Sequence, residues 1–423
     1  MRRIVRGIVL GLVALAVIGL VVVLALNRRD ETEIPAGAKP SDGSAAQIER
    51  GAYLARAGNC NGCHTARGGA PYAGGRGIAT PFGTVYSSNL TPDEKTGIGT
   101  WSVEHFWRAL HNGRSKDGRL LYPAFPYPNY TQVTREDSDA IYAFLRSLPP
   151  IDRPNLAHEV TFPYNAQLSV AVWRALFFDP GVYQADPKQS AEWNRGGYLV
   201  RGLGHCNACH SSRNIFGATS DNLELSGGLI PMQNWYAPSL GSRLEAGVSD
   251  WKGEDVVNLL KKGISPRGSV LGPMAEVVYS STQYLGDADV HAMAVFLKSL
   301  PESGSVPQEW PRRHDPTLWP AGRKLYEQHC AQCHGPDGEG AAGAYPPLDG
   351  NRAVVMGTPA NLIRVVLNGG YVPATKANPR PYGMPPFGHV LNDAEISAVI
   401  TYIRQAWSNE AAPVSSSQVL QFR

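Results

Sequence analysis

The chain has 423 residues, of which 43% are hydrophobic and 18% charged, and its formal net charge is +3. This length predicts about three domains, and the mixing of both charge signs beyond the N-terminus argues against nucleic-acid binding. The 45 glycines and 33 prolines exceed the usual share of these residues, so long loops are expected between the elements of secondary structure.

The N-terminus combines basic residues with an apolar run. Arginines at positions 2, 3 and 6 precede residues 7–26, which carry no charged or polar side chain after Arg6. A helix of that length spans about 30 Å, the thickness of the hydrocarbon layer of a bilayer. No convincing signal-peptidase site follows, so residues 1–29 are predicted to be an uncleaved anchor in the bacterial inner membrane, with a cleaved signal peptide as the alternative. The basic residues predict a cytoplasmic N-terminus, with the body of the chain in the periplasm.

Three copies of the motif Cys-x-x-Cys-His follow, at residues 60–64, 206–210 and 330–334. This motif is typical of c-type haem attachment, in which both thiols bind the haem covalently and the histidine is the proximal iron ligand. A zinc site would need four ligands, and disulfide bonds would not explain the histidine after each cysteine pair. Haem attachment is therefore the favoured interpretation, and it also requires a location outside the cytoplasm.

The motifs predict three covalently bound haem c groups and leave no cysteine for a disulfide bond. The attaching residues are Cys60, Cys63, Cys206, Cys209, Cys330 and Cys333, and the proximal ligands are His64, His210 and His334.

Three helical patterns recur around each motif in the same order. A leading helix precedes the cysteines, a second helix ends at a glycine, and a closing helix completes the unit. Three such units predict a mainly α protein with three tandem cytochrome c-like haem domains and long loops, preceded by one N-terminal transmembrane helix. The leading helices are expected at residues 48–56, 194–201 and 321–326, the second helices at 101–113, 251–263 and 361–369, and the closing helices at 139–148, 289–300 and 393–407.

The domain boundaries follow from these units. Residues 30–45 are polar, contain proline and glycine, and are predicted to be a flexible linker. Residues 151–190 form a longer apolar connection with a helical pattern at 168–178, which we expect to brace the first two domains. The haem domains are predicted at residues 46–150, 191–301 and 302–409, and a mobile tail at 410–423.

Methionine is a frequent sixth ligand of haem iron because its thioether raises the reduction potential. Met384 lies just before the closing helix of the third unit, and Met274 lies between Gly263 and the closing helix of the second unit. Both are predicted to be distal ligands. The methionines at positions 232, 293 and 356 are interpreted as core residues.

The first unit departs from this pattern. Phe125 stands where the other two units place methionine, and no methionine occurs from residue 2 to residue 231. Phenylalanine cannot bind iron, so the first haem is expected to be five-coordinate, to borrow a nitrogen or oxygen ligand, or to take a methionine from another domain. Candidates for a borrowed ligand are His105, His111, Tyr122, Tyr127 and Tyr130.

Several segments carry a resemblance to a known family. The three motifs, together with Tyr86–Pro92, Lys116–Arg119, Leu121–Ala124, Gly272–Ala275 and Ser281–Leu285, resemble the triheme cytochrome c subunit of bacterial membrane-bound dehydrogenases. Those complexes oxidise alcohols, gluconate, sorbitol or fructose on a PQQ or flavin subunit, and similar cytochromes serve periplasmic molybdenum hydroxylases.

The resemblance covers about residues 46–405 and implies the same five iron ligands, namely the three proximal histidines, Met274 and Met384. Phe125 departs from the methionine common in that family. The N-terminal anchor departs as well, because many members attach through a C-terminal helix.

The sequence therefore predicts an electron-transfer subunit without an organic active site of its own. Its expected partners are a catalytic dehydrogenase subunit of the PQQ, flavin or molybdenum type, the membrane, and ubiquinone or a terminal oxidase as electron acceptor. One alternative is a haem-based peroxidase or small-ligand reductase that uses an open first haem, although Phe125 offers no polar distal group. Another is a carrier of the diffusible type that is merely tethered by its N-terminus.

Overall fold

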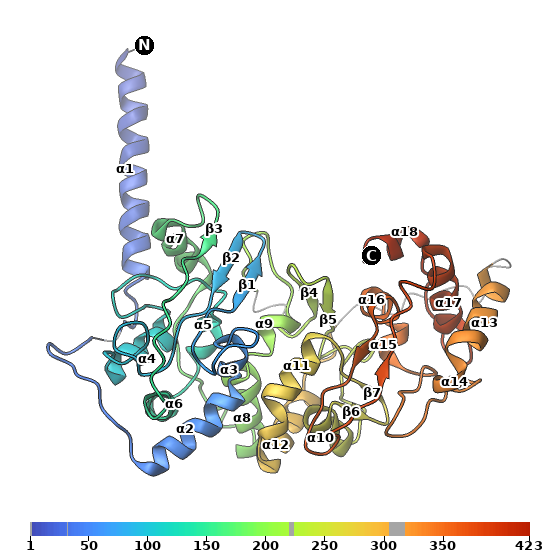
Figure 1. Cartoon of the computed structure of the whole chain (residues 1–423). Coiled ribbons are helices and arrows are strands. Elements are labelled where there is room, and N and C mark those ends of the chain that lie inside the picture. Colours follow the sequence, from blue (N-terminus) through green and yellow to red (C-terminus); the bar gives the residue numbers. More distant parts are fainter. Residues whose placement is uncertain (1, 32, 220–223, 304–317) are drawn as a thin grey trace. The chain divides into compact units, whose positions relative to one another are not determined.

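The structure is a computed structural model that describes residues 2–31, 33–219, 224–303 and 318–423 (Figure 1). The chain divides into two compact units, of which the first comprises Met1–Ala55 and Cys63–Gln184, and the second Arg56–Gly62 and Ala185–Arg423. Helices predominate in both units, as expected. The predicted boundary between residues 301 and 302 adjoins residues 304–317, which lie outside the described residues.

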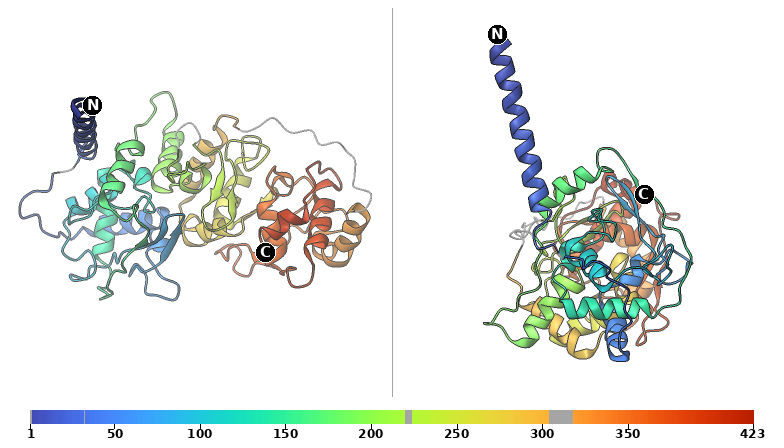
Figure 2. Two further views of the ribbon diagram at one scale, coloured as in Figure 1. Left: turned by 90° about the horizontal axis from the view of Figure 1, so that it is seen from above. Right: turned by 90° about the vertical axis from the view of Figure 1, so that its left-hand side faces the viewer.

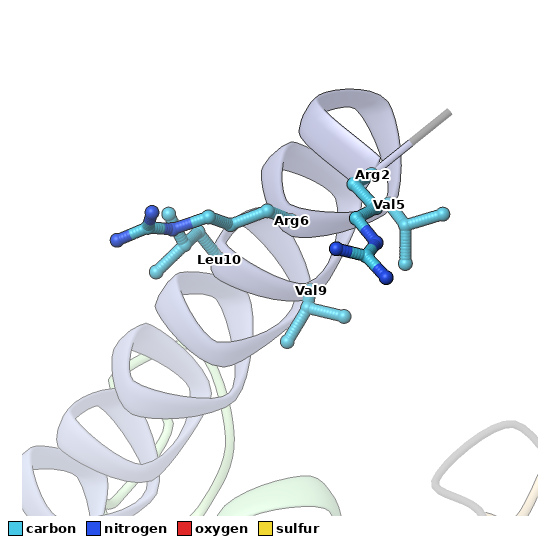
Figure 3. A pocket seen from close by; sticks show the side chains of 5 residues that line it. All are labelled: Arg2, Val5, Arg6, Val9 and Leu10. Atoms are coloured by element: carbon cyan, nitrogen blue, oxygen red, sulfur yellow. The ribbon is translucent and has the colours of Figure 1, made fainter.

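Helix α1 (Arg2–Leu26) is the one helix among the described residues that is long and apolar enough to cross a membrane, with a mean hydropathy of 3.2 over its most apolar window. None of its residues is buried, and Figure 2 shows it projecting from the first unit as a separate helix. Figure 3 shows Arg2 and Arg6 beside Val5, Val9 and Leu10 at its N-terminal end. An apolar helix with basic residues at its start matches the anchor expected from the sequence.

One pairing of helices occurs three times and depends on a glycine. Each leading helix crosses a closing helix so closely that a Cβ on the glycine would collide with a carbonyl oxygen of the partner helix. Glycine permits this approach because it has no side chain. The pairs are α2 (Ala45–Ala57) with α6 (Arg135–Arg146) at Gly51 and Ala140, α8 (Ala191–Gly197) with α12 (Asp287–Lys298) at Gly196 and Ala292, and α13 (Leu318–His329) with α17 (Asp393–Gln405) at Gly322 and Ala398.

The second helix of each predicted unit also forms and ends at the expected glycine. These are α4 (Val103–Asn112), α10 (Gly253–Lys262) and α16 (Ala360–Asn368). The glycines that follow them have φ angles of +57°, +73° and +66°, positive values that glycine adopts with little strain. The helix order expected from the sequence therefore recurs three times in the structure.

Short antiparallel strands accompany the helices and were not expected from the sequence. Strands of two to four residues are too short to show the alternating pattern of a half-buried strand. One sheet has the order β1 (Gly77–Thr80), β2 (Gly83–Tyr86) and β3 (Glu159–Val160). The hairpins pair β4 (Gly228–Ile230) with β5 (Trp235–Ala237), β6 (Ile264–Ser265) with β7 (Gly268–Ser269), and β8 (Gly370–Tyr371) with β9 (Gly383–Met384).

The connection after the first predicted haem domain belongs to the first unit as far as Gln184. It contains α7 (Gln167–Phe177), close to the helix expected at 168–178. Its role as a brace between two domains stays a prediction. The remaining helices of the described residues outside the haem motifs are α5 (Tyr127–Tyr130), a π-helix at Tyr198–Leu203, α11 (Pro273–Ser280), a 3-10 helix at Thr282–Tyr284, α15 (Arg352–Val355) and α18 (Ser416–Leu420).

The C-terminal residues differ from the mobile tail expected from the sequence. Val414 and Val419 are 1% and 0% exposed and belong to the hydrophobic cluster around α17. The Ser397 hydroxyl donates a hydrogen bond to the Val414 carbonyl at 2.6 Å, and Nε of Arg404 donates to the Ala412 carbonyl at 2.8 Å. The expectation of a mobile tail is therefore wrong, because the two valines complete the core of the third helical unit.

Replacing Val419 by alanine is expected to lower the free energy of unfolding by about 2 kcal/mol, because buried methyl groups are lost and a cavity remains. The neighbouring Leu420 is 63% exposed, so Leu420→Ala should cost less than about 0.5 kcal/mol. Thermal unfolding followed by far-ultraviolet circular dichroism measures both variants. Equal effects of the two substitutions would contradict the packing of the tail.

Candidate haem sites

Each Cys-x-x-Cys-His motif forms or borders a single helical turn, namely α3 (Cys60–Cys63), α9 (Asn207–His210) and α14 (Ala331–His334). The first cysteine is partly buried and the second is exposed in all three copies, and the six cysteines form no disulfide bond with one another. Burial raises the pKa of Cys206 and of Cys330 to about 12, so these two groups are uncharged thiols at neutral pH. The three copies thus present the same pair of thiols in the same local setting.

The histidine of each motif makes the same contact with the main chain. Nδ1 lies 2.7 Å from the Ser88 carbonyl oxygen in His64, 2.7 Å from that of Pro238 in His210, and 3.1 Å from that of Pro346 in His334. A carbonyl oxygen only accepts hydrogen bonds, so Nδ1 carries the proton in all three rings. The other nitrogen, Nε2, then keeps its lone pair for a metal.

Burial lowers the pKa of all three histidines, and the hydrogen bond to the carbonyl partly opposes this shift. The imidazoles are therefore held neutral, which is the form that binds iron. The sequence did not reveal the three acceptors, because the main-chain carbonyl of any residue type can serve this purpose.

A loop follows each motif, and a turn at a glycine brings the chain back to its histidine. The backbone amides of Gly74, Gly227 and Gly340 donate to the carbonyls of the three histidines at 2.7, 2.7 and 2.8 Å. All three glycines have positive φ angles, of +72°, +85° and +68°. This conformation favours glycine, so the turn is a further feature shared by the three copies.

The zinc alternative finds no support in the arrangement of side chains. Among the residues that the structure describes, no group of three or more His, Cys, Asp or Glu side chains is placed to hold a metal ion. A zinc ion would need four such ligands. A haem needs only a nitrogen ligand and two thiols from each motif, because the porphyrin supplies the four equatorial nitrogens. The residues present therefore fit haem c.

The two methionines predicted as distal ligands occupy different elements. Met274 lies in the first turn of α11, after Gly272, whose φ angle is +56° and against which the Trp235 ring packs. Met384 lies in β9 and contacts the hydrophobic cluster of α17. Both side chains are partly buried. Their binding to iron stays a prediction.

Phe125 lies beside other aromatic side chains. Its ring lies 5.4 Å from the Tyr130 ring and 6.5 Å from the Tyr127 ring, measured between centroids. The histidines considered as substitute ligands have other partners. In His111, Nδ1 lies 2.9 Å from the Thr131 carbonyl oxygen and Nε2 lies 3.3 Å from Asp30. Nδ1 of His105 takes part in the capping box at the start of α4, so His111 has both ring nitrogens engaged and His105 one.

Two segments of the chain match a known protein family. The family model for cytochrome c matches residues 48–149 and 320–407. The chain is 38% identical to the cytochrome c subunit of alcohol dehydrogenase (quinone) from Gluconobacter oxydans (strain 621H), over 91% of this chain and 84% of that protein.

Two further relatives are matched over most of their own length. The gluconate 2-dehydrogenase cytochrome c subunit of Pantoea cypripedii is 36% identical over 89% of this chain and 90% of that protein. The fructose dehydrogenase cytochrome subunit of Gluconobacter japonicus is 36% identical over 92% and 85%. The chain therefore belongs to the family of cytochrome c subunits of bacterial alcohol, gluconate and fructose dehydrogenases, and it is an electron-transfer subunit rather than a catalytic one.

Proposed function

We propose that the protein is a triheme c-type cytochrome that relays electrons from a periplasmic dehydrogenase subunit to ubiquinone or a terminal oxidase. The observation that carries the proposal is the threefold occurrence of a neutral histidine whose Nδ1 donates to a backbone carbonyl, next to two cysteines that are not in disulfide bonds. Three haem c groups bound at these places would supply three one-electron couples in one chain.

Different residues of the chain have different roles at each proposed site. The cysteine pairs would hold the cofactor covalently, and the carbonyl contacts fix the orientation and the tautomer of His64, His210 and His334. Met274 and Met384 offer soft thioethers that favour reduced iron and raise its potential. Phe125 offers no ligand, so the first site is open or takes a ligand from elsewhere.

Helix α1 supports the proposed location of the protein. We infer that it anchors the protein in the inner membrane with its N-terminus in the cytoplasm, because Arg2 and Arg6 lie at that end (Figure 3). The haem domains then lie in the periplasm, where covalent haem attachment takes place.

The relatives named above guide the choice of partner. They are the cytochrome subunits of dehydrogenases for alcohols, gluconate and fructose, and a nicotinate dehydrogenase subunit of Pseudomonas putida is 41% identical over 86% of this chain and 31% of that protein. We propose a catalytic subunit with a PQQ, flavin or molybdenum cofactor as the electron donor.

Purification of the tagged chain from its own membranes in mild detergent tests this function. We expect a second, larger subunit to copurify with a PQQ, flavin or molybdenum cofactor, and substrate of that subunit to reduce the haems. A chain that purifies alone and is reduced only by dithionite would contradict the proposal. Rapid oxidation of the reduced chain by peroxide would instead favour the peroxidase alternative.

Oxidised protein is expected to show a high-spin signal from one haem in three, because Phe125 leaves the first site without a methionine. In Phe125→Met this signal should disappear and the potential of one haem should rise. Electron paramagnetic resonance and a redox titration measure both effects. The matched variant Met384→Leu should lose a methionine ligand and therefore show a second high-spin haem. Three low-spin haems in the unmodified protein would contradict an open first site.

A further inference from the structure

The end of helix α1 is joined to the first unit by buried hydrogen bonds. Nδ2 of Asn27 donates to the Ala171 carbonyl at 2.8 Å, and Nε of Arg174 donates to Oδ1 of Asn27 at 2.8 Å. Asn27 and Arg174 are 7% and 4% exposed, and Val23 packs on the apolar cluster of Val170 and Ala171. Burying these polar groups is favourable only while they stay paired, so the contacts hold α1 in place on α7.

The residues that follow are also held, which differs from the free linker expected from the sequence. Nδ2 of Asn112 donates to the Asp30 carbonyl at 2.8 Å, and the Asp30 carboxylate lies 3.3 Å from Nε2 of His111. Arg114 forms an ion pair with Glu31 at 2.7 Å. The direction in which α1 leaves the first unit is therefore set by contacts on both α4 and α7.

Helix α7 has one buried and one exposed face. Val170, Ala171 and Arg174 are buried against the first unit. The exposed face carries Leu168, Val172 and Leu176, which are 58%, 38% and 66% exposed. Residues four apart lie on the same side of a helix, so these three form an apolar stripe that no part of the described chain covers.

The loop before α7 continues this apolar surface. Phe162 and Tyr164 are 82% and 40% exposed, and the Tyr164 ring lies 4.4 Å from the Phe82 ring, measured between centroids. Figure 1 shows α7 and β3 on the side of the first unit from which α1 projects. Aromatic residues are enriched where a protein meets the boundary between lipid and water.

We propose that this surface, formed by Leu168, Val172 and Leu176 with Phe162 and Tyr164, lies in the lipid interface beside α1. The argument rests on the proposed function in so far as α1 spans the membrane. Asn27, at the end of the apolar run, is bonded to Ala171 in the middle of α7, so α7 lies at the depth where the run leaves the hydrocarbon layer. An amphipathic helix at that depth gains free energy by burying its apolar face among lipids.

The bilayer is the occupant that the geometry favours, because α7 is bonded to the end of α1, the helix proposed to face lipid. A protein partner is absent when the purified chain is placed in vesicles, and a second copy of the chain would shield the stripe from lipid. Labelling of the stripe from the lipid phase therefore separates these cases.

The test uses the full-length haem-loaded chain in vesicles of phosphatidylethanolamine and phosphatidylglycerol that contain a lipid-soluble diazirine. Light converts the diazirine to a carbene that inserts into side chains in contact with lipid, and mass spectrometry locates the adducts. We expect adducts on α1 and on the peptide 162–177. The triple variant Leu168→Ser, Val172→Ser and Leu176→Ser should lose the adducts on α7 and keep those on α1.

The matched control is Leu156→Ser, which changes another exposed leucine of the first unit, 48% exposed, and should leave the labelling of α7 unchanged. Unaltered haem absorption and far-ultraviolet circular dichroism check that the variants fold. Adducts on α1 without adducts on 162–177 would overturn the inference and leave the anchor intact. A lack of adducts on both would refute the membrane anchor itself, and with it the inference.

Discussion

Replacing Cys206 and Cys209 together by serine is expected to lower the haem content from three to two per chain. Serine hydroxyls do not form thioether bonds, and each of the three motifs has its own cysteine pair and its own carbonyl partner for the histidine. The other two sites should therefore load normally. The alkaline pyridine spectrum of the purified chain, divided by its protein concentration, should fall by one third.

The control for this experiment is Ala208→Ser, which alters one of the two residues between the cysteines and leaves the motif intact. It should keep three haems. A content of three haems in the double variant would show that the second motif does not attach a cofactor. A content of zero would show that the sites are loaded together rather than one by one.

Gly322→Ala is expected to lower the free energy of unfolding by about 1–3 kcal/mol, because overpacked cores lose that much stability. The new methyl group would collide with the Ala398 carbonyl oxygen where α13 crosses α17. The two helices must then separate, and Tyr402, which also lies against this glycine, must move. For a domain of about 100 residues, 1 kcal/mol corresponds to a melting temperature lower by at least about 4 °C.

Gly253→Ala supplies the comparison for this variant. Gly253 starts α10, and a Cβ built there meets no atom within 4 Å. Alanine should be neutral there, or stabilising by up to about 1 kcal/mol, because it reduces the entropy of the unfolded chain. Similar melting temperatures for the two variants would contradict the close crossing of α13 and α17.

The features that the sequence predicted correctly have local signals. Helical periodicity located α4, α10 and α16, and the glycines that end them were visible because few other residues adopt a positive φ angle without strain. The Cys-x-x-Cys-His motifs are visible in the sequence because the chemistry predicted for them resides in side chains at a fixed spacing, and their binding of haem stays a prediction.

Other features depend on contacts between residues far apart in the chain. The sequence places Asn27 at the end of the anchor segment and Asp30 in a flexible linker. It gives no sign of their contacts, because the partners Arg174 and His111 lie more than 80 residues away. Val419 was placed in a mobile tail for the same reason, since the core that buries it is made by α17. The carbonyl acceptors of the haem histidines left no trace in the sequence, because every residue has a carbonyl.

The buried joint between Asn27 and Arg174 also restricts how the molecule can move. With α1 in the bilayer, the first unit remains free to drift and to spin about the membrane normal, but it cannot swing outward on a slack tether. His64, which belongs to the first unit, would then stay at one fixed height above the lipid surface. A redox partner of a haem bound to His64 would have to present its own redox centre at the same height.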